Sequence, residues 1–324
     1  MGKKILRELV TFILFILAVS FISFLLLDIS PIDPIASFAR AKGSGLDQSQ
    51  KAALIAKWGL DKPLFERYLS WLANLVRGDL GISNIYNREV IAIIKEGFAN
   101  SFVLMALAWI LQGVLGIFLG LVAGANIGSL RDKFIKAYAI IFASTPSFWL
   151  GLVLIMVFSI KLKLFPASMG SPAGVLTEDI SFADRLYHMV LPCLCLSLVG
   201  SSNIILHTRA KTEDILNEDF ISYAKARGMT KREIISKYAL KNLILPGLSL
   251  LFTYFSELFS GTILVENVFS YPGLGSLTVE AGLRSDAPLL LGLVLFSSIF
   301  VYLGNRLWDL ILPRLDVRLG GAYE

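Results

Sequence analysis

The sequence is short of charge. Only 17% of its 324 residues are Asp, Glu, Lys or Arg, whereas soluble domains carry roughly a quarter. Hydrophobic residues make up 55% of the chain, and its mean hydropathy is +0.69. This balance excludes an ordinary soluble globular domain. It predicts an all-α membrane protein, since helices satisfy their own backbone hydrogen bonds in lipid.

The sequence also lacks the motifs of common enzymes. It contains no G-x-x-x-x-G-K-[ST] loop to hold nucleotide phosphates and no H-E-x-x-H pair. An intramembrane enzyme would need a paired nucleophile and base, or two facing aspartates, and neither is apparent. We therefore predict no catalytic residue on this chain, and any ATP must be hydrolysed by another subunit.

Cysteine and histidine are scarce, with two of each. Cys193 and Cys195 are two residues apart, so on a helix their side chains diverge by about 200°. His188 and His207 lie at opposite ends of the same predicted span, so they are too far apart to bind one metal ion together with the cysteines. We predict no metal site here, no disulfide framework, and a packing role for both cysteines.

Apolar runs long enough to cross ~30 Å of hydrocarbon recur along the chain. The first is too long for a typical signal-peptide core and is followed by no small-x-small cleavage site, so we predict that it is retained. The sequence predicts one transmembrane domain over residues 1–324 with six helices. These spans are Leu9–Leu27, Phe98–Ala125, Ala137–Ile160, Met189–Leu206, Asn242–Val265 and Ala287–Asn305.

Basic residues predict the orientation of these spans. They gather before span one, between spans two and three, between spans four and five, and after span six, which places both termini in the cytoplasm. The long opposing loop, 28–97, holds nine basic residues that its acids nearly neutralise, and long loops translocate largely regardless of charge. The net charge of +5 therefore reflects topology, and nucleic acid is not expected as a partner.

The 28–97 loop, predicted to be extracytoplasmic, has helical patterns of its own. Pro31 and Pro34 end the first span because proline cannot continue the hydrogen-bond ladder. Helices are expected at about Gln48–Trp58 and Pro63–Val76. The second carries a stripe of apolar and aromatic side chains suited to an interface. The loop is either a cap packed on the bundle or a gate or docking ledge.

The segment 219–246 is the most informative part of the chain, because it is charged and lies between two apolar runs. Asp219 is predicted to cap a first helix, with Phe220, Tyr223 and Ala224 sharing one face. Gly228 is expected to end that helix with a positive φ. A T-x-x-E capping box at 230–233 then restarts the helix, and Pro246 closes the pattern.

Several motifs carry a family resemblance. They are WGLDKP (58–63), GDLGIS (78–83), TPSFWLG (145–151), LFP (164–166), HTR (207–209), ENVFSYPGLG (266–275) and the Asp316/Arg318 ending. In this order and spacing, the chain resembles permease subunits of bacterial ABC importers in the dipeptide, oligopeptide and nickel group, from Asp28 to Arg318. One departure is Ile32, where the family usually has the glycine of Pro-Gly-Asp-Pro.

The resemblance implies a type I ABC importer-like subunit in the bacterial cytoplasmic membrane. It implies as partners a second permease subunit, identical or homologous, two ATP-binding subunits that use ATP and Mg, and an extracytoplasmic substrate-binding protein. It also implies that residues 211–242 form the cytoplasmic coupling loop, which enters a groove of the ATPase. The expected coupling residues are Asp219, Phe220, Tyr223, Ala224, Ala226, Gly228, Leu245 and Pro246.

The translocation pathway is expected to be lined by polar groups within the spans. Glu257 is the one acid deep in a predicted span; a charge there costs at least ~2.5–3.5 kcal/mol, so it should face the bundle or a wet cavity. It could attract a substrate's amino group or a cation, or it could form a structural hydrogen bond to another helix or to the partner subunit. Further candidates are Asn100, Gln112, Asn203, Thr253 and Ser256. Pro146 is expected to kink the third span.

Short peptides are the first expectation for the substrate, and nickel or a nickel chelate is the alternative. A passive channel would account for six spans but would not need the charged segment 219–246. A helix–turn–helix contact with DNA is disfavoured, because that segment is tethered between two spans.

Overall fold

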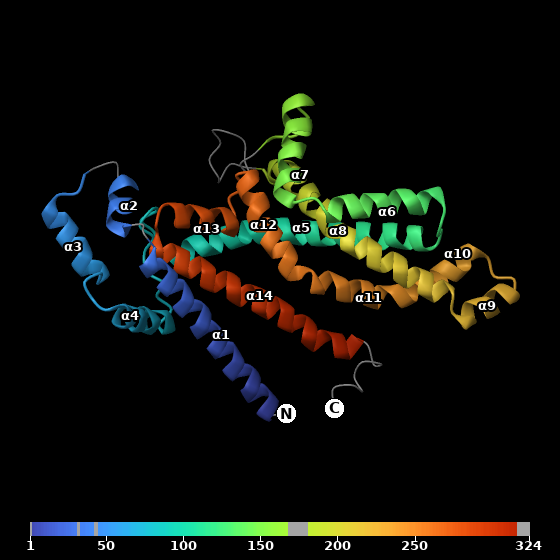
Figure 1. Cartoon of the computed structure of the whole chain (residues 1–324), viewed down its shortest axis with the longest axis horizontal. Coiled ribbons are helices and arrows are strands. Elements are labelled where there is room, and N and C mark those ends of the chain that lie inside the picture. The colour runs from blue at the N-terminus through green and yellow to red at the C-terminus, as the bar shows by residue number, and fades with distance from the viewer. Residues whose placement is uncertain (1, 31–32, 42–44, 168–180, 316–324) are drawn as a thin grey trace. The chain divides into compact units, whose positions relative to one another are not determined.

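The computed structural model describes residues 2–30, 33–41, 45–167 and 181–315 (Figure 1). Pro31, Ile32 and the Asp316/Arg318 ending lie outside the described residues. Among the described residues the elements are helices, joined by turns and one isolated β-bridge. They form two compact units, divided after Asn100, Tyr271 and Tyr302.

The first unit contains the N-terminal helix and the predicted outer loop. Its elements are α1 (Gly2–Ile29), α2 (Pro34–Ala41), α3 (Gln48–Trp58), α4 (Leu64–Val76), α13 (Leu274–Leu283), the start of α5 (Val90–Gly124) and most of α14 (Ala287–Leu315). The two helices predicted in the outer loop are confirmed as α3 and α4. The second begins one residue later than expected, because Pro63 stands before its first turn.

The apolar stripe of α4 packs on α1. Tyr68 and Phe24 are buried together, with their rings 5.7 Å apart, and the Tyr68 hydroxyl lies 3.0 Å from Ser20 Oγ. Trp71 lies beside the same rings. The stripe that the sequence predicted is therefore an internal packing surface of the first unit.

Two features of the first unit were not predicted. Helix α2 begins at Pro34, which suits the first turn of a helix. The second is α13, which is helical from Leu274 through the GLGSL stretch. Asp286 follows α13, where it accepts hydrogen bonds from Ser83 Oγ at 2.6 Å and the Ile85 backbone N–H at 2.9 Å. The loop before α5 is thereby fixed to the start of α14.

The second unit contains the rest of α5 and α14 with the helices between them. These are α6 (Leu130–Ala143), α7 (Ser147–Leu154), η1 (Ile155–Lys161), α8 (Phe182–Leu216), α9 (Asp219–Ala226), α10 (Lys231–Ile234), η3 (Ile235–Ala239), α11 (Leu240–Thr253) and α12 (Phe255–Val268). The two η elements are π-helices.

The six predicted spans are confirmed in part. Four helices among the described residues are long and apolar enough to cross a membrane, and the number is six if two bent pairs each count as one span. The third predicted span is one of these pairs. A single kinked helix was expected at Pro146, but α6 and α7 meet at 107°. The chain breaks over 144–146 because Pro146 cannot continue the ladder of α6. The fifth span bends by 45° between α11 and α12.

A seam of small residues joins α5 to α8. A Cβ atom built on any of three glycines of α5 would lie 2.5 Å from a side-chain carbon of α8. The pairs are Gly116 with Ile204, Gly120 with Thr208, and Gly124 with Thr212. From one pair to the next, the residue on α5 and the residue on α8 both advance by four positions, so the two helices run parallel and in register. Glycine lets their backbones approach closely, as in many membrane helix pairs.

Candidate functional site

Segment 219–246, called the coupling segment below, forms α9, α10, η3 and the first half of α11. The sequence predicted that Asp219 caps the first helix, and this detail is wrong. Glu218 is the N-cap residue, without a side-chain hydrogen bond, and Asp219 is the first helical residue. Its negative charge still lies in the first turn, where it interacts favourably with the positive end of the helix dipole.

The predicted shared face of α9 is also corrected. Phe220 and Tyr223 are exposed, by 42% and 66%, whereas Ala224 is buried. Ala224 belongs to a small core with Ile221 and Ile234. Helix α9 therefore has an inner face that holds the segment together and an outer face that presents two aromatic rings. Sequence spacing missed this division because Phe220 and Ala224, four residues apart, lie on opposite sides of the boundary.

The turn between α9 and α10 is built as predicted. Gly228 has a φ of +79°, a backbone conformation that residues with a Cβ atom rarely adopt. Thr230 and Glu233 form the expected capping box, in which each side chain accepts from the other residue's backbone N–H. The Thr230 backbone N–H donates to Glu233 at 2.8 Å, and this bond holds the pKa of the carboxyl below its usual value.

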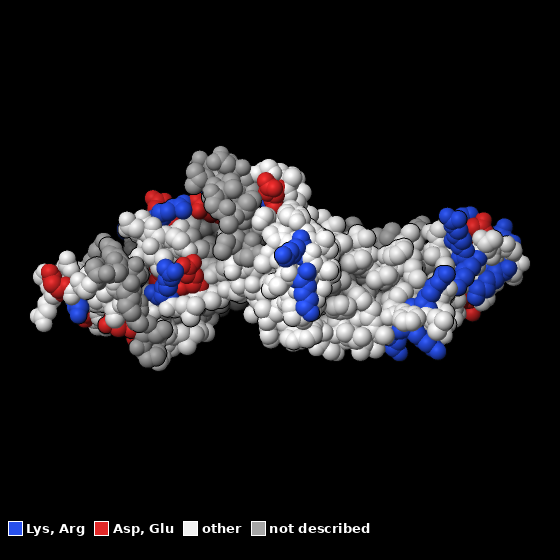
Figure 2. Space-filling view, turned by 90° about the horizontal axis from the view of Figure 1, so that it is seen from above, with Lys and Arg blue, Asp and Glu red and all other residues white. Residues whose placement is uncertain are grey.

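Two ring contacts lie within the coupling segment, and a side-chain hydrogen bond ties it to the rest of the second unit. The Phe220 ring lies 5.8 Å from Tyr238, and the Arg227 guanidinium lies 5.8 Å from the Tyr223 ring. Lys231 Nζ donates to Asn126 Oδ1 at 3.0 Å, which joins α10 to the turn after α5. Figure 2 shows basic side chains gathered over the end of this unit that carries α9 and α10.

The remaining predicted coupling residues have structural positions of their own. Ala226 ends α9 and is exposed. Leu245 and Pro246 lie inside α11. Pro246 was expected to close the pattern, but the helix continues through it. The π-helix η3 ends at Ala239, about two turns before Pro246.

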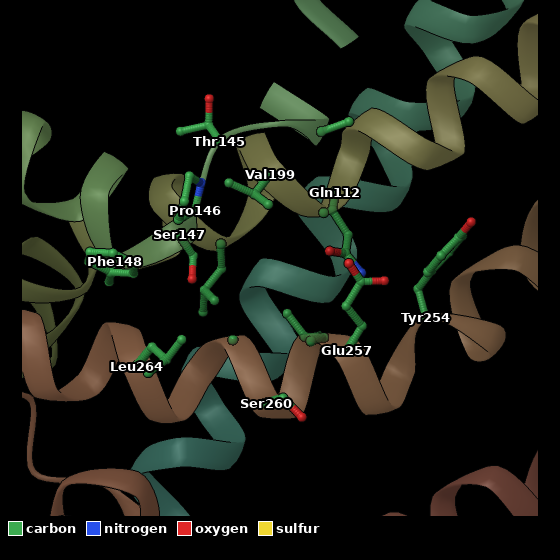
Figure 3. Close-up of a pocket in the computed structure, with 15 residues that line it drawn as sticks. Gln112, Thr145, Pro146, Ser147, Phe148, Val199, Tyr254, Glu257, Ser260 and Leu264 are labelled. Atoms are coloured by element: carbon green, nitrogen blue, oxygen red, sulfur yellow. The ribbon is translucent and has the colours of Figure 1, made fainter. Parts of the chain in front are cut away.

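A cavity of about 390 Å³ lies within the second unit, between α5, α8, α12 and the break before α7 (Figure 3). Glu257, in the first turn of α12, lines it. Gln112 of α5 lines it as well, and in Figure 3 the two side chains extend toward each other. Further polar lining groups are Thr145, Ser147, Tyr254 and Ser260. Both bent spans therefore bend where they line this cavity.

Gln112 is unusual among the described residues. Its side chain is 1% exposed, yet neither its amide nitrogen nor its amide oxygen has a hydrogen-bond partner. Leaving such a group unpaired costs about 1–3 kcal/mol. The sequence singled out Gln112 only as one of several polar residues. Its position within the Gly-x-x-x-Gly spacing of α5 was the signal that could have distinguished it.

The other predicted pathway residues do not line this cavity. Asn100 donates to the Pro272 carbonyl at 2.8 Å in the first unit. Ser256 shares hydrogen bonds with Asn305, and Thr253 donates to the carbonyl of Ser249. Asn203 is half-buried on α8. The Ser256–Asn305 bonds join α12 to α14, as polar groups in membrane spans often do, whereas the Thr253 bond lies within α11.

The cysteines occupy packing positions. Cys195 is buried, and its thiol lies 3.1 Å from the carbonyl of Ser147. Cys193 is half-buried and is also a free thiol. Within the described ranges, no group of three or more His, Cys, Asp or Glu side chains is placed to hold a metal ion.

Sequence comparisons cover almost the whole chain. Residues 116–321 match the family described as "Binding-protein-dependent transport system inner membrane component", and residues 1–101 match the N-terminal domain of such membrane components. The oligopeptide transport system permease protein AppB of Bacillus subtilis is 30% identical over 90% of both chains. The dipeptide transport system permease protein DppB of Escherichia coli K12 is 32% identical over 89% of this chain and 90% of its own.

A comparison of folds agrees. The structure resembles a chain of the MetNI methionine ABC transporter, solved in inward-facing conformations, with a TM-score of 0.51. The match covers 70% of this chain and 97% of the other, at 17% identity, and therefore shows a shared fold. The type I importer-like helical fold expected from the sequence is supported. The chain belongs to the family of binding-protein-dependent transport system inner membrane components, as a permease subunit in the membrane.

Proposed function

We propose that this chain is one of two permease subunits of an ATP-driven importer of short peptides. Two separate ATP-binding subunits supply the energy, and an extracytoplasmic binding protein delivers the substrate. The peptide assignment rests on relatives named as dipeptide and oligopeptide permeases. ATP and Mg are used by the partner subunits, and this chain binds no cofactor.

The observation that carries the coupling role is the outer face of α9. Two aromatic rings are exposed on a surface that also carries charged side chains, while Ile221, Ala224 and Ile234 pack together in a buried core behind them. Exposed apolar groups on a rigid, polar-rimmed element are typical of a protein interface. This surface is the contact for the ATP-binding subunit.

The orientation follows from the same segment. Basic residues surround α9 and α10 (Figure 2), and such residues favour the cytoplasmic side. The coupling segment and both termini then face the cytoplasm, where ATP is available. Helices α2, α3 and α4 belong to the loop on the opposite side, where a binding protein would deliver its substrate.

Reconstitution tests this assignment. Vesicles would hold this chain, its permease partner and the two ATP-binding subunits, with binding protein on the outer side. We expect a radiolabelled dipeptide to accumulate against its gradient only when ATP is present. Vesicles without the ATP-binding subunits are the control. Concentrative uptake in that control, or uptake of Ni²⁺ with no uptake of a dipeptide or longer peptide, would overturn the proposal.

A further inference from the structure

The α5–α8 seam places Gln112 where a small residue would be expected. Gln112 lies four residues before Gly116 on α5, and Gly200 lies four residues before Ile204 on α8. The same parallel alignment therefore places Gln112 against Gly200. A Cβ atom on Gly200 would lie 1.9 Å from Gln112 Oε1, so this glycine leaves the space that the amide occupies. The side chain of Gln112 thus fits against the surface of α8. It lines the same cavity as Glu257.

The unsatisfied groups of Gln112 define the kind of ligand that would satisfy them. A primary amide offers N–H donors and a carbonyl acceptor side by side. A peptide group offers one carbonyl acceptor and one N–H donor, so the two can pair with each other. A bound cation alone would leave the Gln112 N–H groups unpaired. A ligand that contains an amide would pair with both the nitrogen and the oxygen of the Gln112 side chain.

Glu257 adds a charge requirement to the same cavity. It is the acid in the first turn of α12, directly after the bend at Tyr254, and its carboxylate extends toward Gln112 (Figure 3). Charge-assisted hydrogen bonds to a carboxylate are roughly twice as strong as neutral ones. The walls are otherwise largely apolar, with Phe148, Leu196 and Leu264, as in many ligand pockets of about 300–1,000 Å³.

We propose that this cavity is a peptide-binding subsite within the membrane subunit. Glu257 binds the α-ammonium group of the peptide, and Gln112 pairs with its first peptide group. The apolar walls accept varied side chains. This inference rests on the proposed function, and it adds that the permease itself, besides any binding protein, recognises the amino-terminal end of its cargo.

Thiol protection in the assembled importer tests the subsite without relying on the binding protein or on ATP. Ser260 is exposed and lines the cavity, so a Ser260→Cys variant offers a thiol for a methanethiosulfonate reagent. Alanylalanine should slow its labelling, and the peptide concentration that gives half protection measures affinity. The same complex without Ser260→Cys corrects for reaction at Cys193 and Cys195.

Substitutions of the two binding groups should weaken protection. Gln112→Met and Glu257→Gln should each raise the half-protecting concentration about tenfold, the loss expected for one hydrogen bond to a charged or buried group. Gly200→Ala should weaken protection as well, because its methyl group displaces the Gln112 amide. The matched controls, Gln48→Met and Glu66→Gln, are exposed residues of α3 and α4 and should leave the half-protecting concentration unchanged.

Acetylation of the peptide's amino group separates the two contacts. N-acetyl-alanylalanine should protect about tenfold more weakly than the free dipeptide, and Glu257→Gln should weaken it no further. Equal loss for both peptides in the Glu257→Gln variant would contradict the ammonium contact. No protection in vesicles that do accumulate the dipeptide would overturn the subsite and leave the importer assignment standing. Vesicles that accumulate neither a dipeptide nor a longer peptide would overturn the proposed peptide-importer function itself.

Discussion

The coupling segment and the Gln112–Glu257 cavity both lie in the second unit, and each departs from the usual distribution of side chains. On α9, two aromatic rings are exposed on a strongly basic surface. In the cavity, an amide is buried without a partner between apolar helices. Natural sequences tend to break local rules where function requires it. The first departure suits a protein partner, and the second suits a small polar ligand.

The structural support of the two regions also differs. Helices α9 and α10 of the coupling segment are short, and they are held by three buried residues and a capping box. The cavity is lined in part by two long helices, α5 and α8, which are joined along a glycine seam. Variants in the first region should therefore uncouple transport without affecting peptide binding. Variants in the second should weaken binding and leave coupling intact.

The largest effect is expected from Gly228→Val. Its φ of +79° is strained for a β-branched residue, at a cost of about 1–3 kcal/mol, so α9 and α10 should lose their arrangement. ATP-dependent uptake should be abolished, while thiol protection by dipeptide in the cavity is unchanged. Uptake and protection measured on the same reconstituted complex check both statements.

Gly78→Val is the matched control for this variant. Gly78 also has a positive φ, +81°, and open space around the position of a Cβ atom, but it lies in the first unit. Its backbone strain should be comparable, and uptake should persist. Loss of uptake in Gly78→Val alone, with normal uptake in Gly228→Val, would contradict the coupling role of the segment 219–246.

A smaller effect should separate the inner and outer faces of α9. Ile221 is fully buried, and Ile221→Ala should cost about 2–5 kcal/mol of local stability, seen as faster hydrogen exchange in 219–234. Tyr223→Ala should leave exchange unchanged in the isolated permease, since exposed substitutions usually change stability by less than about 0.5 kcal/mol. It should instead weaken association with the ATP-binding subunit. Faster exchange in Tyr223→Ala would show that the ring is structural.

The smallest effect is expected from protonation of Glu233. The pKa of its carboxyl is lowered in the folded segment by the Thr230 backbone hydrogen bond. The capping box therefore contributes its full stability above the unfolded pKa, and this contribution is lost as pH falls through the folded value. Acidic pH should slightly increase hydrogen exchange in α10. Glu233→Gln should abolish this dependence, and a dependence that survives would assign it to another group.

Much of this architecture could be predicted from the sequence, because apolar runs and turn signals are local. The positive φ of Gly228, the Thr230–Glu233 capping box and the α4 stripe were all predicted from spacing. The 107° bend at Pro146 was underestimated, since proline shows where a helix is interrupted but not how far the next helix turns. Helix α13 was not predicted, because Gly275 and Ser276 at its start are residues typical of turns.

The candidate sites were harder to predict, because they depend on packing between distant segments. Ala224 was placed with the exposed aromatics, but its burial depends on Ile234, ten residues further along the chain. Gln112 stands out only when α5 is aligned against α8, which reveals Gly200 opposite it. The hydrophobic periodicity of one sequence does not show either of these contacts.

Site-specific cross-linking tests the coupling claim most directly. Tyr223→Cys places a thiol on the exposed face of α9, and Leu69→Cys places one on an exposed position of α4 in the first unit. In the assembled importer, we expect a thiol-reactive bifunctional reagent to join the Tyr223→Cys variant to the ATP-binding subunit and not to join the Leu69→Cys variant to it. A cross-link to that subunit from Leu69→Cys, or none from Tyr223→Cys in a complex that hydrolyses ATP, would show that the outer face of α9 is not the contact for the ATP-binding subunit.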